Sequence, residues 1–218
     1  MDWNRRWAKK KWLLNIKWHK AWANNVEKII ETAIDNNIEY LTLWALSKEN
    51  LIKRDPKEIQ SIIKLINNIE TFLSKMIQNW LKFETIWDIS LLPKKSQIIL
   101  NSIKEKTKNN TKITLILALV YSWKDEIIRW LQKINQKWID LTKIDSNTFK
   151  NYLDTANFPD PDLIIRTGWV QRHSWFLLYT SEYSEYYFSD LMWPDFNKLE
   201  FQNAINLFKK TQRRFWWN

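Results

Sequence analysis

The chain of 218 residues is 45% apolar, carries a formal net charge of +10 and contains no cysteine; this suits one compact domain in a reducing cytoplasm and excludes disulfides and thiolate metal sites. No apolar run approaches the length of a membrane span, and the charged N-terminus excludes a signal peptide. The positive charge favours anionic partners such as phosphorylated metabolites, nucleic acid or an acidic membrane surface, although drift in a lysine-rich composition would give the same excess.

The hydrophobic pattern predicts helices that alternate with buried strands. In chain order we expect a helix over 19–36, a strand at 38–46, a helix over 56–79, a strand at 81–87, a helix over 94–108, a strand at 113–121, a helix over 124–136, strands at 162–168 and 175–180, and a helix over 198–212. This alternation predicts an α/β fold with a mostly parallel central sheet covered by helices on both faces, in a single domain over 1–218. The opening segment lacks an apolar strand before its first helix, so we expect a domain truncated at the N-terminus.

Glycine and tryptophan occur in unusual numbers, with 1 Gly and 16 Trp. At the average usage of about 7%, a chain of this length would contain about 15 glycines. Tryptophan is a poor substitute in turns, because its Cβ and indole clash with the backbone at positive φ. Either this chain turns corners unusually, or many tryptophans stand where glycine belongs.

Three polar clusters, "DWNRR" at 2–6, "SKEN" at 47–50 and "RTGWVQRHS" at 166–174, fall near the expected strand ends. Ligands of parallel α/β sheets bind beyond the carboxyl ends of the strands. An aspartate that holds Mg²⁺ beside several arginines suits diphosphate chemistry, because both neutralise phosphate oxygens as the leaving group departs. Taken singly each cluster is weak, since an arginine pair is usually solvated surface and "SKEN" is typical of a helix cap.

The order and wording of the motifs are more specific. The stretches are "MDWNRRWAKK", "LTLWALSKEN", "DLIIRTG", "QRHS" and "FLLYTSEYSEYYFSDLMWPDF". From Met1 to Trp217 they resemble, in sequence order, the cis-prenyltransferase family and within it the bacterial undecaprenyl diphosphate synthases. The resemblance implies a Mg²⁺-dependent transferase that extends an allylic diphosphate, typically farnesyl diphosphate, by cis additions of isopentenyl diphosphate. The product would be a long polyprenyl diphosphate, the precursor of a lipid carrier for cell-wall synthesis.

The resemblance also implies a role for each matching residue. Asp2 matches the essential aspartate that positions Mg²⁺, and Glu185 matches a carboxylate associated with metal binding. His19 matches a histidine that contacts phosphate. The residues that match the cradle of the allylic diphosphate are Trp3, Asn4, Arg5, Arg6 and Trp7.

Two further groups match the rest of the active site. Asn50 matches the residue linked to proton removal and to coupling between the substrates, and it lies in a segment with Ser47, Lys48, Glu49 and Leu51. The residues that match the isopentenyl diphosphate pocket are Arg166, Arg172, His173 and Ser174. The apolar face of the helix at 56–79 is expected to line a hydrophobic product tunnel, and ordinary core packing is the alternative. Leu51 replaces a usual aromatic, and Val170 replaces a usual acid.

The same resemblance explains the unusual number of tryptophans. The positions where the family usually has glycine are Trp3, Trp12, Trp18, Trp22, Trp87, Trp123, Trp138, Trp169, Trp216 and Trp217, with Trp80 and Trp175 matching less clearly. Trp7 and Trp193 match tryptophans of the family, Trp44 fits as a native tryptophan, and Trp130 is undecided. One residue type replaced by one other indicates a gene that encodes glycine with UGA, read here as tryptophan. A chain with real tryptophans at 3 and 169 is expected to be inactive.

The resemblance implies a homodimer and a cytoplasmic protein that works at the inner membrane face without crossing it, with no nucleic-acid partner. Two alternatives stay open at this point. One is a catalytically silent family member that acts as a scaffold, and the other is a basic, tryptophan-rich module that binds nucleic acid.

Overall fold

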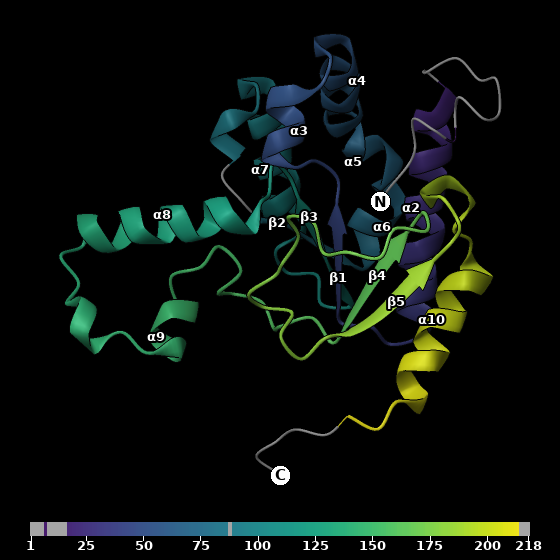
Figure 1. The fold of residues 1–218 in the computed structure, drawn as a ribbon. Helices are drawn as coiled ribbons and strands as arrows, with labels where there is room; N and C mark the ends of the chain where they lie inside the picture. Colours follow the sequence, from purple (N-terminus) through teal and green to yellow (C-terminus); the bar gives the residue numbers. More distant parts are fainter. Residues whose placement is uncertain (1–6, 8–16, 87–88, 214–218) are drawn as a thin grey trace. The chain divides into compact units, whose positions relative to one another are not determined.

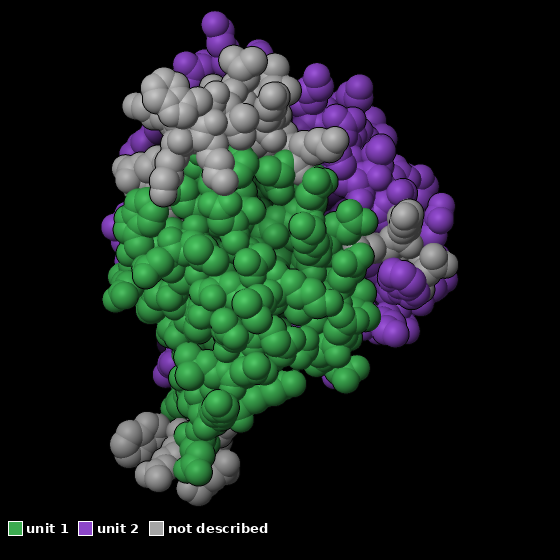
Figure 2. Space-filling view, turned by 90° about the vertical axis from the view of Figure 1, so that its right-hand side faces the viewer, with its two compact units in different colours: residues 1–37, 162–171, 183–218 green, residues 38–161, 172–182 purple. Residues whose placement is uncertain are grey.

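The computed structural model describes residue 7 and residues 17–86 and 89–213. The chain divides into two compact units, each assembled from segments that are distant in sequence (Figure 2). Unit 1 comprises residues 1–37, 162–171 and 183–218, and unit 2 comprises residues 38–161 and 172–182. The expectation of one catalytic domain over the whole chain stays a prediction.

Unit 2 is built on a three-stranded parallel sheet with the order β1-β3-β2 (Figure 1). Its strands are β1 (Tyr40–Trp44), β2 (Leu81–Ile86) and β3 (Ile113–Ala118). The central strand β3 is almost continuously apolar, and Leu115, Ile116 and Leu117 are all buried. Burial of successive residues means that both faces of this strand are covered, as is typical of parallel sheets.

Helices follow each strand of unit 2 and supply most of its core. They are α3 (Lys48–Lys53), α4 (Pro56–Asn67), α5 (Ile69–Phe72), α6 (Ser74–Asn79), α7 (Lys94–Thr107), α8 (Trp123–Gln136) and α9 (Ser146–Lys150), with short 3-10 turns η1 (Ile89–Leu91) and η2 (Leu141–Lys143). Helices α6 and α7 pack against β2. Helix α8 extends away from the sheet, and the chain returns through α9 (Figure 1).

The prediction of one continuous helix over 56–79 is wrong. The chain breaks at Asn68 and Leu73, where ψ is 7° and 10°, so α4, α5 and α6 are separate. The side chain of Asn68 donates a hydrogen bond to the carbonyl of Lys64 at 3.0 Å. Asparagine competes with the helix by such bonds, which favours termination. The apolar stripe nevertheless continues across the breaks, because its members Ile62, Ile66, Ile69, Leu73 and Ile77 are all buried.

Unit 1 contains a two-stranded parallel sheet of β4 (Leu163–Thr167) and β5 (Glu185–Ser189). It also contains α2 (Lys17–Asp35), the 3-10 turn η3 (Trp193–Asp195) and α10 (Lys198–Lys210), with α2 packed against both η3 and α10. The buried amide of Asn25 in α2 donates hydrogen bonds to the carbonyls of Trp193 at 2.6 Å and Phe196 at 2.9 Å. These bonds fix α2 to the turn before α10.

The strand predicted at 175–180 is wrong, because this segment forms successive turns. Ser174 and Leu177 have φ of 58° and 44°, which a strand does not allow. The strand that pairs with β4 lies instead at Glu185–Ser189. The other predicted helices and strands are found within a few residues of their expected bounds. The α/β class with parallel strands is confirmed, and the described strands divide between two sheets.

The helices were expected not to span a membrane. In the part of the chain that the structure describes, none of them combines the length and the apolar character needed to cross a bilayer.

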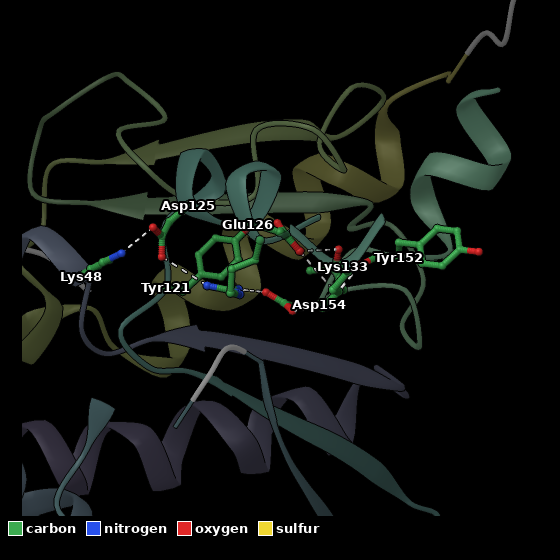
Figure 3. A network of polar contacts seen from close by, with 9 residues as sticks. Lys48, Tyr121, Asp125, Glu126, Lys133, Tyr152 and Asp154 are labelled. Atoms are coloured by element: carbon green, nitrogen blue, oxygen red, sulfur yellow. Dashed lines mark hydrogen bonds and ion pairs between the residues drawn. The ribbon is translucent and has the colours of Figure 1, made fainter. Parts of the chain in front are cut away.

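Helix α8 is fixed at its first turn by a buried carboxyl group. Glu126 is only 3% exposed and accepts hydrogen bonds from the hydroxyl of Tyr121 at 2.6 Å and from the N–H and hydroxyl of Thr155, each at 3.2 Å (Figure 3). Burial raises the pKa of Glu126, and the hydrogen bonds from Tyr121 and Thr155 oppose this rise without cancelling it. Burial, together with the charge of Glu126, also raises the pKa of Tyr121, so its phenol stays neutral.

Tryptophans matched to family tryptophans, or left undecided, have interior surroundings. Trp7, Trp130 and Trp193 are buried. Trp44 stacks on Phe176 with ring centroids 5.1 Å apart. Each of these indoles therefore has a packing role that glycine could not fill.

Most described tryptophans at glycine-like positions differ from these. Trp138 and Trp169 have φ of 53° and 48° and are 92% and 48% exposed. The left-handed region is unfavourable by about 1–2 kcal/mol for a residue with a Cβ. Trp80 and Trp175 are also exposed, whereas Trp22 is buried within α2 and Trp123 is half-buried at the start of α8.

Replacing Trp138 or Trp169 by glycine is expected to raise the free energy of unfolding by about 1 kcal/mol at each site, because glycine has no Cβ clash at positive φ. Denaturant unfolding of the single variants measures this. Trp130→Gly is the matched control at a buried position, where the loss of packing should lower stability by about 3–5 kcal/mol. Destabilisation by all three substitutions would contradict the assignment of glycine positions.

The stability of the protein is expected to fall as pH rises from the ordinary carboxyl range through the raised pKa of Glu126. The folded state binds this proton more tightly than the unfolded chain, so the slope is negative and approaches about 1.4 kcal/mol per pH unit. Urea unfolding at a series of pH values should show that Glu126→Gln removes this slope. The control Glu105→Gln, at an exposed position of α7, should keep it. Identical pH profiles for the parent and Glu126→Gln would refute the buried-proton assignment.

Candidate active site

The carboxyl ends of β1 and β3 lie side by side in unit 2, and each leads directly into a helix. Beyond the paired strands, the N–H of Tyr121 donates to the carbonyl of Leu46 at 3.1 Å. Ser47 then begins α3, and Ser122 begins α8; both are buried. This is the edge at which parallel α/β sheets bind their ligands.

The segment 47–51 is a capped helix start. The hydroxyl of Ser47 accepts a hydrogen bond from the N–H of Asn50 at 3.1 Å, so "SKEN" does form the helix cap of which it is typical. Lys48, Glu49 and Asn50 are half-buried. One carboxylate oxygen of Glu49 is buried without a hydrogen-bond partner among the described residues, which leaves an acceptor at this edge.

A chain of ion pairs connects α3 to α8. The ammonium of Lys48 lies 2.5 Å from Asp125, and Asp125 also binds the guanidinium of Arg129 at 3.2 Å (Figure 3). Arg129 pairs in turn with Asp154, which binds Lys133 at 3.1 Å. Burial, followed by repulsion from Arg129, lowers the pKa of Lys133. The network therefore joins α3, α8 and the segment that follows α9.

The turns at 172–182 cross the same edge of the sheet. The carbonyl of Trp175 accepts the N–H of Trp123 at 3.0 Å. Phe176 stacks on Trp44 and meets Tyr121 edge to face, with centroids 6.0 Å apart. The structure thus brings Trp175 and Phe176, which directly follow residues 172–174, to the edge at which the 47–51 segment begins. Arg172 and His173 are exposed, and Ser174 is half-buried.

Backbone strain gathers at this edge. Val120, Ser174 and Leu177 all have φ between 44° and 58°. Val120 is the most unusual, because it is β-branched and completely buried. Strained residues persist only where their surroundings hold them, and they cluster at functional sites.

Sequence reasoning missed Val120 and the supporting residues Tyr121, Asp125, Glu126 and Arg129. Asp125 and Glu126 looked like ordinary acids in the first turn of a helix. A tyrosine that ends a buried strand shortly before two acids was the available signal. The partners on the other side of the network, at 48 and 154–155, could not be inferred from local spacing.

Unit 1 carries two further predicted residues, but at opposite ends of its sheet. Arg166 lies near the carboxyl end of β4 and pairs with Phe188, whereas Glu185 begins β5 and pairs with Leu163. This register separates Arg166 and Glu185 by about 10 Å along the strands. Beyond β4, the N–H of Gly168 donates to the carbonyl of Ser189 at 2.9 Å. The two-stranded sheet does not bring Arg166 and Glu185 together.

The remaining predicted residues belong to the N-terminal segment. Asp2, Trp3, Asn4, Arg5 and Arg6 lie outside the described residues. Trp7 is buried in unit 1. His19 lies in α2, and its side chain is outside the description. The convergence of these residues with those of unit 2 stays a prediction.

The predicted magnesium ligands fit the ion in their chemistry. Asp2 and Glu185 would offer carboxylate oxygens, which are the hard donors that Mg²⁺ prefers. Glu185 is half-buried at the start of β5. Across residues 17–86 and 89–213, no group of three or more His, Cys, Asp or Glu side chains forms a metal site.

Comparison with known proteins places these features in one family. The family described as "Putative undecaprenyl diphosphate synthase" matches residues 1–216. The (2E,6E)-farnesyl-diphosphate specific ditrans,polycis-undecaprenyl-diphosphate synthase of Micrococcus luteus is 41% identical over 99% of this chain and 88% of its own length. The isoprenyl transferase of Staphylococcus haemolyticus is 38% identical over 99% of this chain and 86% of its own length.

Solved structures agree. Lavandulyl diphosphate synthase from Lavandula x intermedia, in complex with dimethylallyl diphosphate, matches with a TM-score of 0.92 and 27% identity over 98% of this chain and 94% of that one. A probable undecaprenyl diphosphate synthase from Campylobacter jejuni matches with a TM-score of 0.77 and 30% identity over 90% and 92% of the two chains. The chain therefore belongs to the prenyltransferase family of the undecaprenyl diphosphate synthases.

Proposed function

We propose that this prenyltransferase condenses isopentenyl diphosphate with an allylic diphosphate, farnesyl diphosphate being the preferred primer, and extends it to a long polyprenyl diphosphate of the undecaprenyl type. One observation supports the proposal: Trp175 and Phe176, which directly follow residues 172–174, lie at the carboxyl edge of β1 and β3, where the 47–51 segment begins. An exposed arginine and a hydroxyl group at this edge suit a diphosphate. The name of the Micrococcus luteus relative supports the choice of primer.

The chemistry explains why these residue types are needed. The allylic C–O bond breaks, a new C–C bond forms to the terminal alkene carbon of isopentenyl diphosphate, and a proton leaves. Positive charge develops on carbon and negative charge on the departing diphosphate, so the site must stabilise an anion and orient an alkene. Residues 2–7 and His19 would bind the leaving diphosphate. The group that would hold isopentenyl diphosphate is Arg166, Arg172, His173 and Ser174.

Asn50 would act where the proton leaves. Its N–H is held by the hydroxyl of Ser47 at 3.1 Å, which fixes the first turn of α3 at the sheet edge. Glu49, with its unpartnered carboxylate oxygen, and Leu51 would complete the contact with substrate. This arrangement supports a role for the amide of Asn50 in orienting isopentenyl diphosphate.

Magnesium is part of the proposal. Asp2 and Glu185 would hold the ion, which supplies positive charge to the diphosphate oxygens when bound. The buried stripe on α4, α5 and α6 would line the tunnel for the growing chain. A homodimer that works at the cytoplasmic face of the membrane, without crossing it, would suit a lipid product.

We also propose that the natural protein has glycine at the positions listed above as glycine-like, through UGA codons read here as tryptophan. The positive φ of Trp138 and Trp169 supports this independently of any relative. Reading the coding DNA is expected to find UGA at these positions and UGG at Trp7 and Trp193. UGG at every position would reject the recoding and leave a relative that has to bind diphosphate around a real Trp3.

In the glycine-restored chain, Asn50→Ala is expected to lower kcat by about 100-fold or more while unfolding stays unchanged, because a group that assists proton transfer is lost. The assay measures incorporation of labelled isopentenyl diphosphate into farnesyl diphosphate. Asn151→Ala, at an exposed turn of the same unit, is the matched control. Chelation by EDTA should stop turnover, and added Mg²⁺ should restore it.

The same assay separates the alternatives. A scaffold without activity would give no product from the glycine-restored chain with Mg²⁺ present. A nucleic-acid-binding module would show salt-dependent oligonucleotide binding in place of turnover. Either result would reject the synthase proposal.

A further inference from the structure

Helix α3 carries the proposed catalytic segment but has little packing of its own. It spans Lys48–Lys53, and none of these residues is buried. Ile52 is 69% exposed and Leu51 is only half-buried, so the helix has no fully buried apolar side chain. Isolated helices of this length are unstable in water, so contacts with other elements must hold α3 in place.

The start of α3 is fixed, but its direction is not fixed by the start alone. Leu46 and Ser47 are buried at the sheet edge, and Leu46 accepts the N–H of Tyr121. At the far end, Arg54 pairs with Glu58 at 2.8 Å, which links α3 only to the next helix. The first turn of α3 meets α8 through Lys48 and Asp125, 2.5 Å apart.

The partner of Lys48 is held more firmly than Lys48 itself. The side chain of Asp125 is 17% exposed, against 34% for Lys48, and it is also bound by Arg129. Arg129 is held by Asp154, and the neighbouring Glu126 is bonded to Tyr121 and Thr155 (Figure 3). Helix α8 is therefore held by several polar contacts, and the ammonium of Lys48 connects the first turn of α3 to it.

We propose that Lys48 is a positioning residue: its ion pair with Asp125 sets the direction of α3 and thereby the place of Asn50 at the sheet edge. The role of Asn50 in this inference rests on the proposed function. The competing role for Lys48 is direct contact with a substrate diphosphate. In that case Asp125 would only compete for the ammonium, and its removal would not harm catalysis.

The first test needs no turnover. Hydrogen–deuterium exchange of the amides at 47–55 is expected to be about threefold faster in Lys48→Met and in Asp125→Asn, the size of effect that a partly exposed ion pair produces. The double variant should exchange no faster than either single variant. Lys48→Arg should keep the parent rate, because the guanidinium can still reach Asp125.

Two controls distinguish loss of the Lys48–Asp125 ion pair from a general destabilisation of α8. Asp154→Asn removes the other partner of Arg129 and leaves Lys48 paired with Asp125, so exchange at 47–55 should stay at the parent rate. Peptides from α7 should exchange equally in every variant. Unchanged exchange at 47–55 in Lys48→Met and Asp125→Asn would overturn the proposal.

The second test uses the turnover-competent chain. Both Lys48→Met and Asp125→Asn are expected to lower kcat by about tenfold, with KM for farnesyl diphosphate within about twofold, since misplacing one catalytic group slows the chemistry more than it weakens binding. The double variant should lose no more. A raised KM for isopentenyl diphosphate in Lys48→Met alone would show direct diphosphate contact and overturn the positioning role.

The outcomes distinguish the two proposals. Turnover by the parent with unaltered kcat in both variants would reject the positioning role and leave the synthase intact. Failure of every chain to turn over would reject the synthase, and the role of Lys48 in placing a catalytic Asn50 would fall with it. The exchange rates would then still show whether the Lys48–Asp125 ion pair holds α3 in place.

Discussion

The parallel pairing of β1 with β3 is the constraint on which the candidate site depends. Because β1 and β3 run in the same direction, both strands end at the same edge of the sheet, and each is followed by a helix within a few residues. Two buried serines, Ser47 and Ser122, stand at these exits. The polar residues of α3 and α8 therefore meet without any long loop, although they are far apart in sequence.

The polar network around α8 shows how a small site is made rigid without more apolar core. Glu126 is buried with its hydrogen-bond partners in place, so its burial adds order at the price of a raised pKa. Asp125, one residue earlier, points its charge to Lys48 and Arg129. The two adjacent acids of α8 therefore have different roles. Glu126 fixes α8 in place, and Asp125 links α8 to α3 through Lys48.

Features that depend on neighbouring residues could be predicted from the sequence, whereas features that depend on contacts between distant residues could not. Strong periodicity gave correct elements, as in α7, β3 and α10, because burial of one face decides the local structure. The apolar run at 175–180 misled, because Trp175, Leu178 and Tyr179 are exposed in the fold. Phe176 packs against Trp44 and Tyr121 from a turn, not from a paired strand. The break at Asn68 was hidden because the apolar stripe continues across it.

The candidate site shows the same division. The cap formed by Ser47 on Asn50 is local, and the residue types at that spacing predicted it. Lys48 and Asp125 are 77 residues apart in the sequence, and no sequence pattern within either helix predicts their ion pair. The family resemblance located Arg166 and Glu185 but not their register, which puts them at opposite ends of two paired strands. The motifs propose candidate residues, and the strand pairing decides which of these candidates one sheet can bring together.

The tryptophans add an argument that does not depend on relatives. The φ of 53° at Trp138 and 48° at Trp169 lies in the left-handed region, which glycine adopts at the least steric cost. Trp22 marks the limit of this reasoning, because a helix requires negative φ and its interior can accommodate an indole. Backbone geometry therefore supports glycine at turns with positive φ. It gives no information at helical positions such as Trp22, where a glycine would matter only for close packing. The family resemblance also predicts glycine at positions 138 and 169, so the backbone geometry and the resemblance favour the same residue there.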